Sequence, residues 1–210
     1  MLITKAKAKS VTSLTEGRYF SGMGIDYIGF SLQENAKNFI NKTHAKEIMD
    51  WLSGPTFVAE LVGASPEFIK EICNDLGIHT IQSNQNIDFT QLPPQIEEVI
   101  VNLSITNETT EKDLSNWMAA HNKQVSFFIL DATQLGGWKK IQETGFDKIM
   151  KNLALDFPCF IKWDFNAAFI KQALEFINPL GVELYAGDEL STGMQSFEEV
   201  DKLMESLEQP

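Results

Sequence analysis

The sequence predicts a single (β/α)8 barrel, an α/β TIM barrel, that occupies residues 1–210. Three observations predict it. Short apolar runs alternate with longer amphipathic segments, which indicates a parallel sheet covered by helices. There are eight such runs, spaced by roughly 25 residues, and the chain has the length of a small barrel, about 200 residues. The alternative, an open doubly wound sheet, usually carries a glycine-rich loop after its first strand, but that turn here is Lys9-Ser10-Val11-Thr12.

The strands are predicted from short runs rich in apolar residues. The first alternates lysine and alanine, and the sixth is the most apolar and ends at Asp131. The expected strands are 2–8, 26–30, 57–62, 79–83, 98–103, 125–131, 159–163 and 182–186.

The helices are predicted from their start and stop signals. Gly24 follows the first helix, Pro55 follows the second, and Pro66 occupies the first position of the third. Pro94 breaks the region after the fourth strand, and Ser196 with nearby acidic residues opens the last helix. The expected helices are 14–23, 43–53, 66–76, 110–121, 135–144, 166–177 and 196–207.

Composition excludes several classes of function. The formal net charge of -12 disfavours nucleic acid and anionic membranes as partners, because phosphates would be repelled. The N-terminus has no apolar signal core, and no run is long enough to span a bilayer. Only Cys73 and Cys159 are present, so no disulfide framework is expected, and the chain is predicted to be cytoplasmic. The three histidines lack ligand spacing, so neither a metal nor a cofactor is predicted.

The first strand suggests charge inside the barrel. Its period of two puts Lys5, Lys7 and Lys9 on one face, and the helices outside make that face the inner one. Buried lysines need partners, and Glu60 and Glu183 lie alone in apolar strands. We therefore predict a charged layer that joins Lys7, Glu60 and Glu183.

In such a barrel the chemistry lies at the C-terminal ends of the strands. Lys9 and Asp131 are the strongest candidates for functional residues, because each is a charged residue at the end of a strand of apolar or small residues. Trp163 is expected either to fill the barrel mouth, together with Tyr185, or to stack on a flat ligand. The positional candidates are Lys9, Phe30, Gly63, Asn84, Ser104, Asp131, Trp163, Asp164, Gly187 and Asp188.

Several stretches resemble phosphoribosylanthranilate isomerase, the tryptophan-pathway barrel. Residues 7–12 and 24–30 resemble the family's Lys-x-Cys-Gly-Ile-Thr and Gly-Ala-Asp-Ala-x-Gly-Phe patterns. Residues 129–131 and 181–189 resemble its Leu-Leu-Asp strand end and its last strand. The resemblance is thin but runs over nearly the whole chain, and it implies the same fold.

The resemblance also implies roles for particular residues. The family's general acid aspartate corresponds to Asp131, whereas its general base cysteine corresponds to Lys9. Asn38 stands in place of the substrate-binding arginine, and Trp163-Asp164 in place of the phosphate-binding glycine pair. Further ligand-binding positions by the same resemblance are Gln82, Asn84, Gly187 and Asp188.

Three functions remain open at this point. The preferred one is a relative without isomerase activity that binds another small molecule or a partner at the C-terminal barrel face, as a monomer or homodimer. The second is a working isomerase, which performs an Amadori-type aldose–ketose isomerisation with Asp131 as acid and an altered base. The third is a different barrel enzyme that uses Lys9 as a Schiff-base or proton-transfer lysine.

Overall fold

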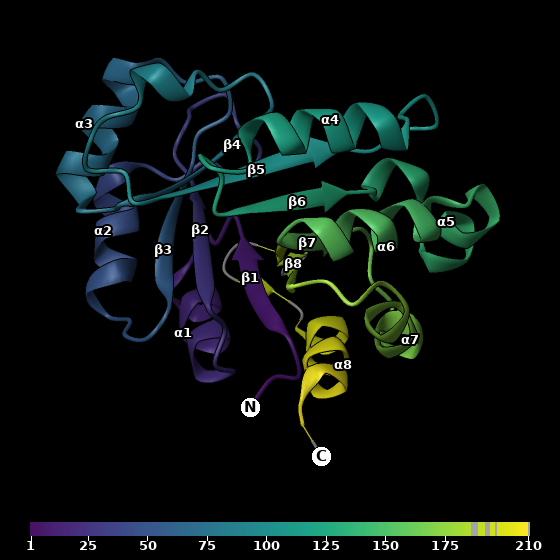
Figure 1. The fold of residues 1–210 in the computed structure, drawn as a ribbon. Coiled ribbons are helices and arrows are strands. Elements are labelled where there is room, and N and C mark those ends of the chain that lie inside the picture. The colour runs from purple at the N-terminus through teal and green to yellow at the C-terminus, as the bar shows by residue number, and fades with distance from the viewer. Residues whose placement is uncertain (186–188, 192–193, 196, 210) are drawn as a thin grey trace.

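In the computed structural model, which describes residues 1–185, 189–191, 194–195 and 197–209, eight parallel strands close into a barrel in sequence order. Helices surround the strands on the outside (Figure 1). The predicted (β/α)8 fold is therefore confirmed. The strands are β1 Lys5–Lys9, β2 Tyr27–Ser31, β3 Thr56–Glu60, β4 Thr80–Asn84, β5 Glu98–Ser104, β6 Phe127–Asp131, β7 Cys159–Lys162 and β8 Gly181–Tyr185.

The outer layer contains one helix that the sequence analysis missed, α6. Gly145, with φ of 78°, ends α5 and begins α6, and the buried face of α6 comes from Phe146, Met150 and Leu153. The prediction allowed one helix per strand and so left this segment unassigned. The helices are α1 Leu14–Gly22, α2 Lys42–Asp50, α3 Pro66–Leu76, α4 Glu111–His121, α5 Trp138–Thr144, α6 Phe146–Asp156, α7 Ala167–Ile177 and α8 Glu198–Leu207.

Smaller differences concern the ends of elements. The first strand begins at Lys5 and not at Leu2, because Leu2 forms an isolated bridge with Glu208 instead. The helix predicted from residue 135 begins at Trp138, after a 3-10 turn over Thr133–Leu135. Another 3-10 turn covers Phe89–Gln91, and a short antiparallel pair, β9 Glu189–Ser191 with β10 Met194–Gln195, was not predicted.

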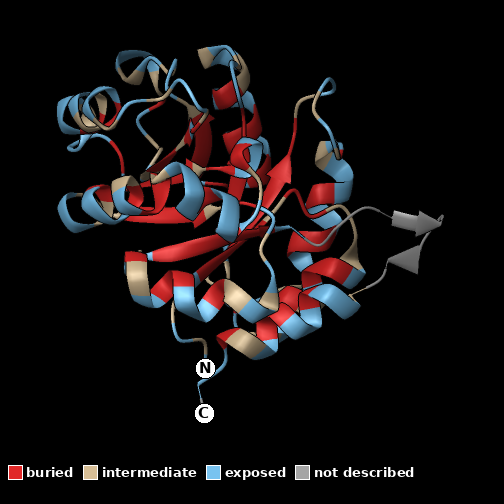
Figure 2. Cartoon of the chain, turned by 90° about the vertical axis from the view of Figure 1, so that its right-hand side faces the viewer, coloured by how far each residue is buried: buried red, intermediate tan, exposed pale blue. Residues whose placement is uncertain are grey.

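Burial follows the strand alternation. Figure 2 shows buried residues along the strands and on the inner faces of the helices, with exposed residues outside. The N-terminal part of the barrel interior is filled by an apolar cluster, built from residues of β2, β3, β5, β6 and β7. This cluster closes that end of the barrel and leaves polar side chains for the other end. Its members are Tyr27, Val58, Ile100, Phe127, Ile129 and Phe160.

No helix among the described residues is long and apolar enough to cross a membrane.

Gly29 makes room for the charges above this cluster. A Cβ at this position would collide with the Glu60 carboxylate and with Lys7 Nζ. We expect Gly29→Ala to destabilise the protein by about 2 kcal/mol, because the added methyl overpacks the interior and displaces an ion pair. Thermal unfolding would show a drop in Tm of about 4–8 °C. Gly22→Ala is the control, since its Cβ would meet nothing within 4 Å; equal effects of the two substitutions would contradict the argument.

Candidate functional site

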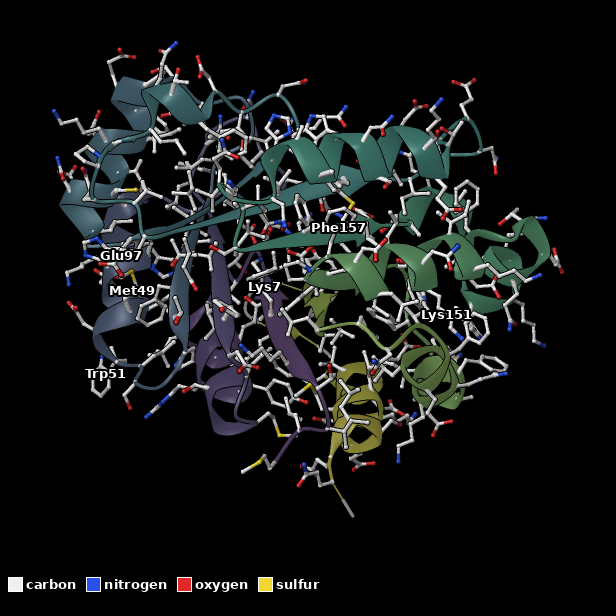
Figure 3. All side chains as sticks on the ribbon, viewed as in Figure 1. Lys7, Met49, Trp51, Glu97, Lys151 and Phe157 are labelled. Carbon is white, nitrogen blue, oxygen red and sulfur yellow. The ribbon has the colours of Figure 1, made fainter. Side chains whose placement is uncertain are left out.

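The predicted charged layer is present at the centre of the barrel. Lys7 Nζ lies 2.6 Å from Glu60 Oε1 and 2.9 Å from Glu183 Oε1. Lys7 has no exposed surface and stands beside Glu183 in the β1–β8 register. Figure 3 shows it among the strands in the middle of the molecule. Burial acts to lower the pKa of Lys7, but attraction to Glu183 and Glu60 outweighs it and raises the pKa. The hypothesis of a Lys7–Glu60–Glu183 layer is confirmed.

Two serines complete the coordination of Glu60. Ser10 Oγ donates to Glu60 Oε2 at 2.6 Å, and Ser31 Oγ donates to the same oxygen at 3.0 Å. The backbone N–H of Ser10 donates to Oε1 at 3.2 Å. The carboxylate is thus held by an ammonium and three further donors, the arrangement that a buried charge requires.

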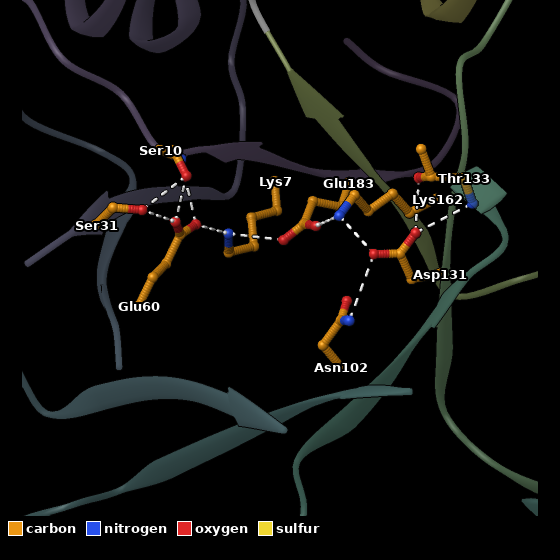
Figure 4. Close-up of polar contacts among 9 residues, drawn as sticks. All are labelled: Lys7, Ser10, Ser31, Glu60, Asn102, Asp131, Thr133, Lys162 and Glu183. Atoms are coloured by element: carbon orange, nitrogen blue, oxygen red, sulfur yellow. Dashed lines mark hydrogen bonds and ion pairs between the residues drawn. The ribbon is translucent and has the colours of Figure 1, made fainter. Parts of the chain in front are cut away.

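A second polar cluster surrounds Asp131 (Figure 4). Lys162 Nζ lies 2.6 Å from Asp131 Oδ2, and Asn102 Nδ2 donates to that oxygen at 3.4 Å. Thr133 donates to Oδ1 through its hydroxyl at 2.6 Å and its backbone N–H at 3.1 Å. Burial acts to raise the pKa of Asp131, but the charge and hydrogen bond of Lys162, with the Thr133 donors, lower it. Asp131 is therefore held as a carboxylate.

Lys162 links the two clusters. Its Nζ lies 3.5 Å from Glu183 Oε2, an oxygen that has no hydrogen-bond partner of its own and is satisfied by this charge. Burial acts to raise the pKa of Glu183, yet Lys7, Lys162 and Lys9 lower it to about 2. For Lys162 itself, burial is outweighed by Glu183 and Asp131, and its pKa is raised. A continuous network therefore runs from Glu60 to Asp131 across the barrel (Figure 4).

The sequence analysis missed Lys162, which pairs with Asp131 and lines the barrel mouth. Strand β7 was expected to run through Trp163, which drew attention to that tryptophan. The signal was nevertheless in the sequence, because Phe160 and Lys162 are two residues apart and share the inner face. The register of β6 with β7 pairs Asp131 with Lys162 directly.

A cavity of about 860 Å³ opens above this network at the C-terminal ends of the strands. Most of the predicted site residues line it, so the fold brings them together. Phe30 and Gly63 are not among the lining residues; Phe30 is buried and packs on Phe57, with ring centroids 5.9 Å apart. Gly187 and Asp188 lie outside the described residues. The lining includes Lys9, Asn38, Gln82, Asn84, Ser104, Asp131, Trp163 and Asp164.

The expectation that Trp163 fills the barrel mouth is wrong. Trp163 is only 5% exposed, and its ring is stacked on Trp138, with centroids 5.7 Å apart and planes at 16°. Its ring also packs against the ring of Phe165, with the two centroids 4.5 Å apart. The indole packs into the helical layer and forms a wall of the cavity, and the cavity stays open. Tyr185 stands at the rim, where its hydroxyl accepts a hydrogen bond from Asn38 Nδ2 at 2.7 Å.

The two cysteines lie away from the cavity lining. Cys73 and Cys159 are buried free thiols, and burial raises their pKa to about 11 and about 12. Within the part of the chain that the structure describes, no group of three or more His, Cys, Asp or Glu could hold a metal ion.

Comparisons with known proteins show that this chain is similar to one group of enzymes. No family model matches it. The curated N-(5'-phosphoribosyl)anthranilate isomerase of Aquifex aeolicus is 26% identical over 203 residues, covering 94% of this chain and 95% of that protein. The enzyme of the same name from Sulfurihydrogenibium sp. is 24% identical over 200 residues, covering 95% and 96%.

A solved structure agrees with these relatives. The phosphoribosyl anthranilate isomerase of Thermotoga maritima superposes with a TM-score of 0.79 at 16% identity, covering 98% of both chains. The chain is therefore a distant relative of the phosphoribosylanthranilate isomerases, similar to them over nearly its whole length.

Proposed function

We propose that this barrel binds a small polar molecule at its C-terminal face, and that it does not carry out the isomerisation for which its relatives are named. The observation that carries the proposal is the ion pair between Asp131 and Lys162, at 2.6 Å. The resemblance gives Asp131 the role of general acid. An acid must hold a proton at working pH, and an aspartate with a lowered pKa does not.

The residue at the position of the general base also supports the loss of isomerase activity. Lys9 occupies the place of the cysteine in the resemblance, and its amine stands next to a second cation, Lys162. An isomerase that uses Lys9 as base and Asp131 as acid would have its acid in the deprotonated form. Such an acid cannot deliver a proton to the ring oxygen of an aldose.

The lining of the cavity supports a ligand rich in hydroxyl groups. Amide and hydroxyl side chains from β4, β5 and the loop after β6 face the opening, among them Asn84, Ser104 and Thr133. Within the described part of the chain, Gln82 Oε1 and Asn102 Oδ1 are buried acceptors without a partner. Acceptors of this kind favour a ligand that brings its own donors.

The resemblance would place the phosphate of a substrate near residues 163–164. Asp164 would repel a dianion there, and Trp163 would keep the backbone from the close approach that a glycine pair allows. We therefore propose an uncharged or weakly anionic ligand.

Two assays test this function. Purified protein should give no turnover of phosphoribosylanthranilate, and its gene should not rescue a tryptophan auxotroph that lacks only this isomerase. Growth that depends on Asp131, and so is lost in Asp131→Asn, would overturn the proposal and make the chain a working isomerase. For binding, D-ribose should raise the Tm of the wild type and leave that of Gln82→Leu unchanged. Failure of D-ribose to shift the Tm, or a larger shift with D-ribose 5-phosphate than with D-ribose, would refute the proposed ligand class.

A further inference from the structure

Three lysines approach the barrel mouth, and their surroundings differ. Lys7 is neutralised by Glu60 and Glu183, and Lys162 by Asp131 with Glu183 nearby. Among the described residues, no carboxylate forms an ion pair with Lys9. Lys9 ends β1, is half-buried, and lines the cavity.

The charged groups that face Lys9 come from several strands. Glu183 on β8 and Glu60 on β3 attract its ammonium form, and Lys162 on β7 repels it. Burial lowers the pKa of Lys9 first, Glu183 opposes this, and Lys162 adds to the lowering. The net direction is downward, whereas burial is outweighed at both neighbouring lysines.

Lys162 is fixed as the cation of the pair. Its contact with Asp131 at 2.6 Å and with Glu183 at 3.5 Å holds its proton. A protonated Lys9 would therefore be repelled by Lys162, which keeps its positive charge. A lysine that is desolvated beside a second cation is the arrangement that activates an amine as a nucleophile.

We propose that Lys9 is a covalent capture site, which forms a Schiff base with the carbonyl group of a small hydroxyaldehyde or hydroxyketone bound in the barrel mouth. This deepens the proposed function and rests on a small polar ligand binding there. The neutral Nζ attacks the carbonyl carbon, the C=O π electrons move to oxygen, and a proton passes from nitrogen to that oxygen to give a carbinolamine. A second proton, taken from solvent, lets the hydroxyl leave as water. The C=N bond that forms is an iminium, so a single positive charge remains at the Lys9 nitrogen.

The surroundings suit each stage of this sequence. The iminium carries the charge that the free amine lacks, and Glu183 and Glu60 attract it. Amide and hydroxyl side chains that line the same cavity as Lys9, among them Gln82 and Ser31, offer partners for the hydroxyl groups of the captured molecule. No oxidant, reductant or further reactant is needed.

Reductive trapping tests the proposal. The probe is glycolaldehyde with sodium cyanoborohydride at pH 7, and the readout is peptide mapping of each modified lysine over time. We expect Lys9 to be modified roughly tenfold faster than the exposed Lys70, because a lowered pKa leaves more of the Lys9 amine neutral at pH 7. Modification of Lys9 no faster than Lys70 would overturn the proposal.

Two variants of Lys162 separate a specific effect from simple exposure. Lys162→Met removes the neighbouring cation and should slow the labelling of Lys9 by about tenfold, with the pH profile moved upward. Lys162→Arg keeps the charge and should label close to the wild-type rate. An unchanged Lys9 rate in a folded Lys162→Met protein, with the fold verified by circular dichroism, would also refute the proposal.

The labelling readout is independent of the isomerase assays. Rapid Lys9 labelling together with turnover of phosphoribosylanthranilate would refute the proposed function and leave the capture site standing. Slow Lys9 labelling together with a Tm shift by D-ribose would refute the capture site alone.

Discussion

Replacement of Lys7 by methionine is expected to lower the free energy of unfolding by about 3–5 kcal/mol. Methionine is close to lysine in shape, so the loss is one of charge. Glu60 and Glu183 would be left facing each other across a buried space without their shared cation. Urea unfolding measured at pH 7 gives the difference directly, and the Tm should fall by roughly 6–20 °C.

The matched control is the same substitution at an exposed ion pair. Lys42 contacts Glu71 and Asp75, both at 2.6 Å, but it is 39% exposed. Lys42→Met should change stability by no more than about 1 kcal/mol, because water solvates the carboxylates that remain. If Lys7→Met were as mild as Lys42→Met, the buried layer would contribute little to stability.

The stability of the wild type is expected to fall steeply in acid because of Glu183. Its pKa is lowered to about 2 in the folded protein, from an ordinary value of 4.5. A carboxyl with a lowered folded pKa contributes stability that is present above the unfolded value and is lost as pH falls through the folded one. A shift of this size corresponds to about 3 kcal/mol, lost between about pH 4.5 and 2.

Glu183→Gln isolates this contribution. The variant keeps the volume and an acceptor for Lys7 but cannot titrate, so its free energy of unfolding should be flatter over the same range of pH. Urea unfolding of both proteins at pH 7, 5, 4 and 3 provides the comparison. Parallel pH profiles would show that the acid sensitivity comes from other carboxyl groups.

Much of the fold could be predicted because the signals are local. Strand alternation identified the inner face of β1, and the same rule led to the partners of Lys7 in β3 and β8. The helix α6 was missed because only one helix was expected after each strand, whereas the left-handed Gly145 ends α5 and begins a second helix at once.

The site was predicted less completely for a physical reason. The strand-end rule gathered Lys9, Asn84 and Asp131 correctly around one cavity. It could not tell which lysine would take Asp131 as its partner, since that depends on the register of β6 against β7. The rule also gave no indication that the Trp163 ring stacks on Trp138.

The position of the Lys7–Glu183 contact has a consequence for folding. The two residues are 176 positions apart and lie across the seam where the first and last strands meet. Beside this seam the ends of the chain also join, with Ile3 N–H donating to the Leu207 carbonyl at 2.7 Å (Figure 1). A chain with seven strands in place would hold a desolvated lysine with only one of its two carboxylates. The second carboxylate arrives only with β8, so the barrel closes and the charge of Lys7 is balanced in the same step. A partly folded chain with seven strands in place is therefore expected to be little stabilised.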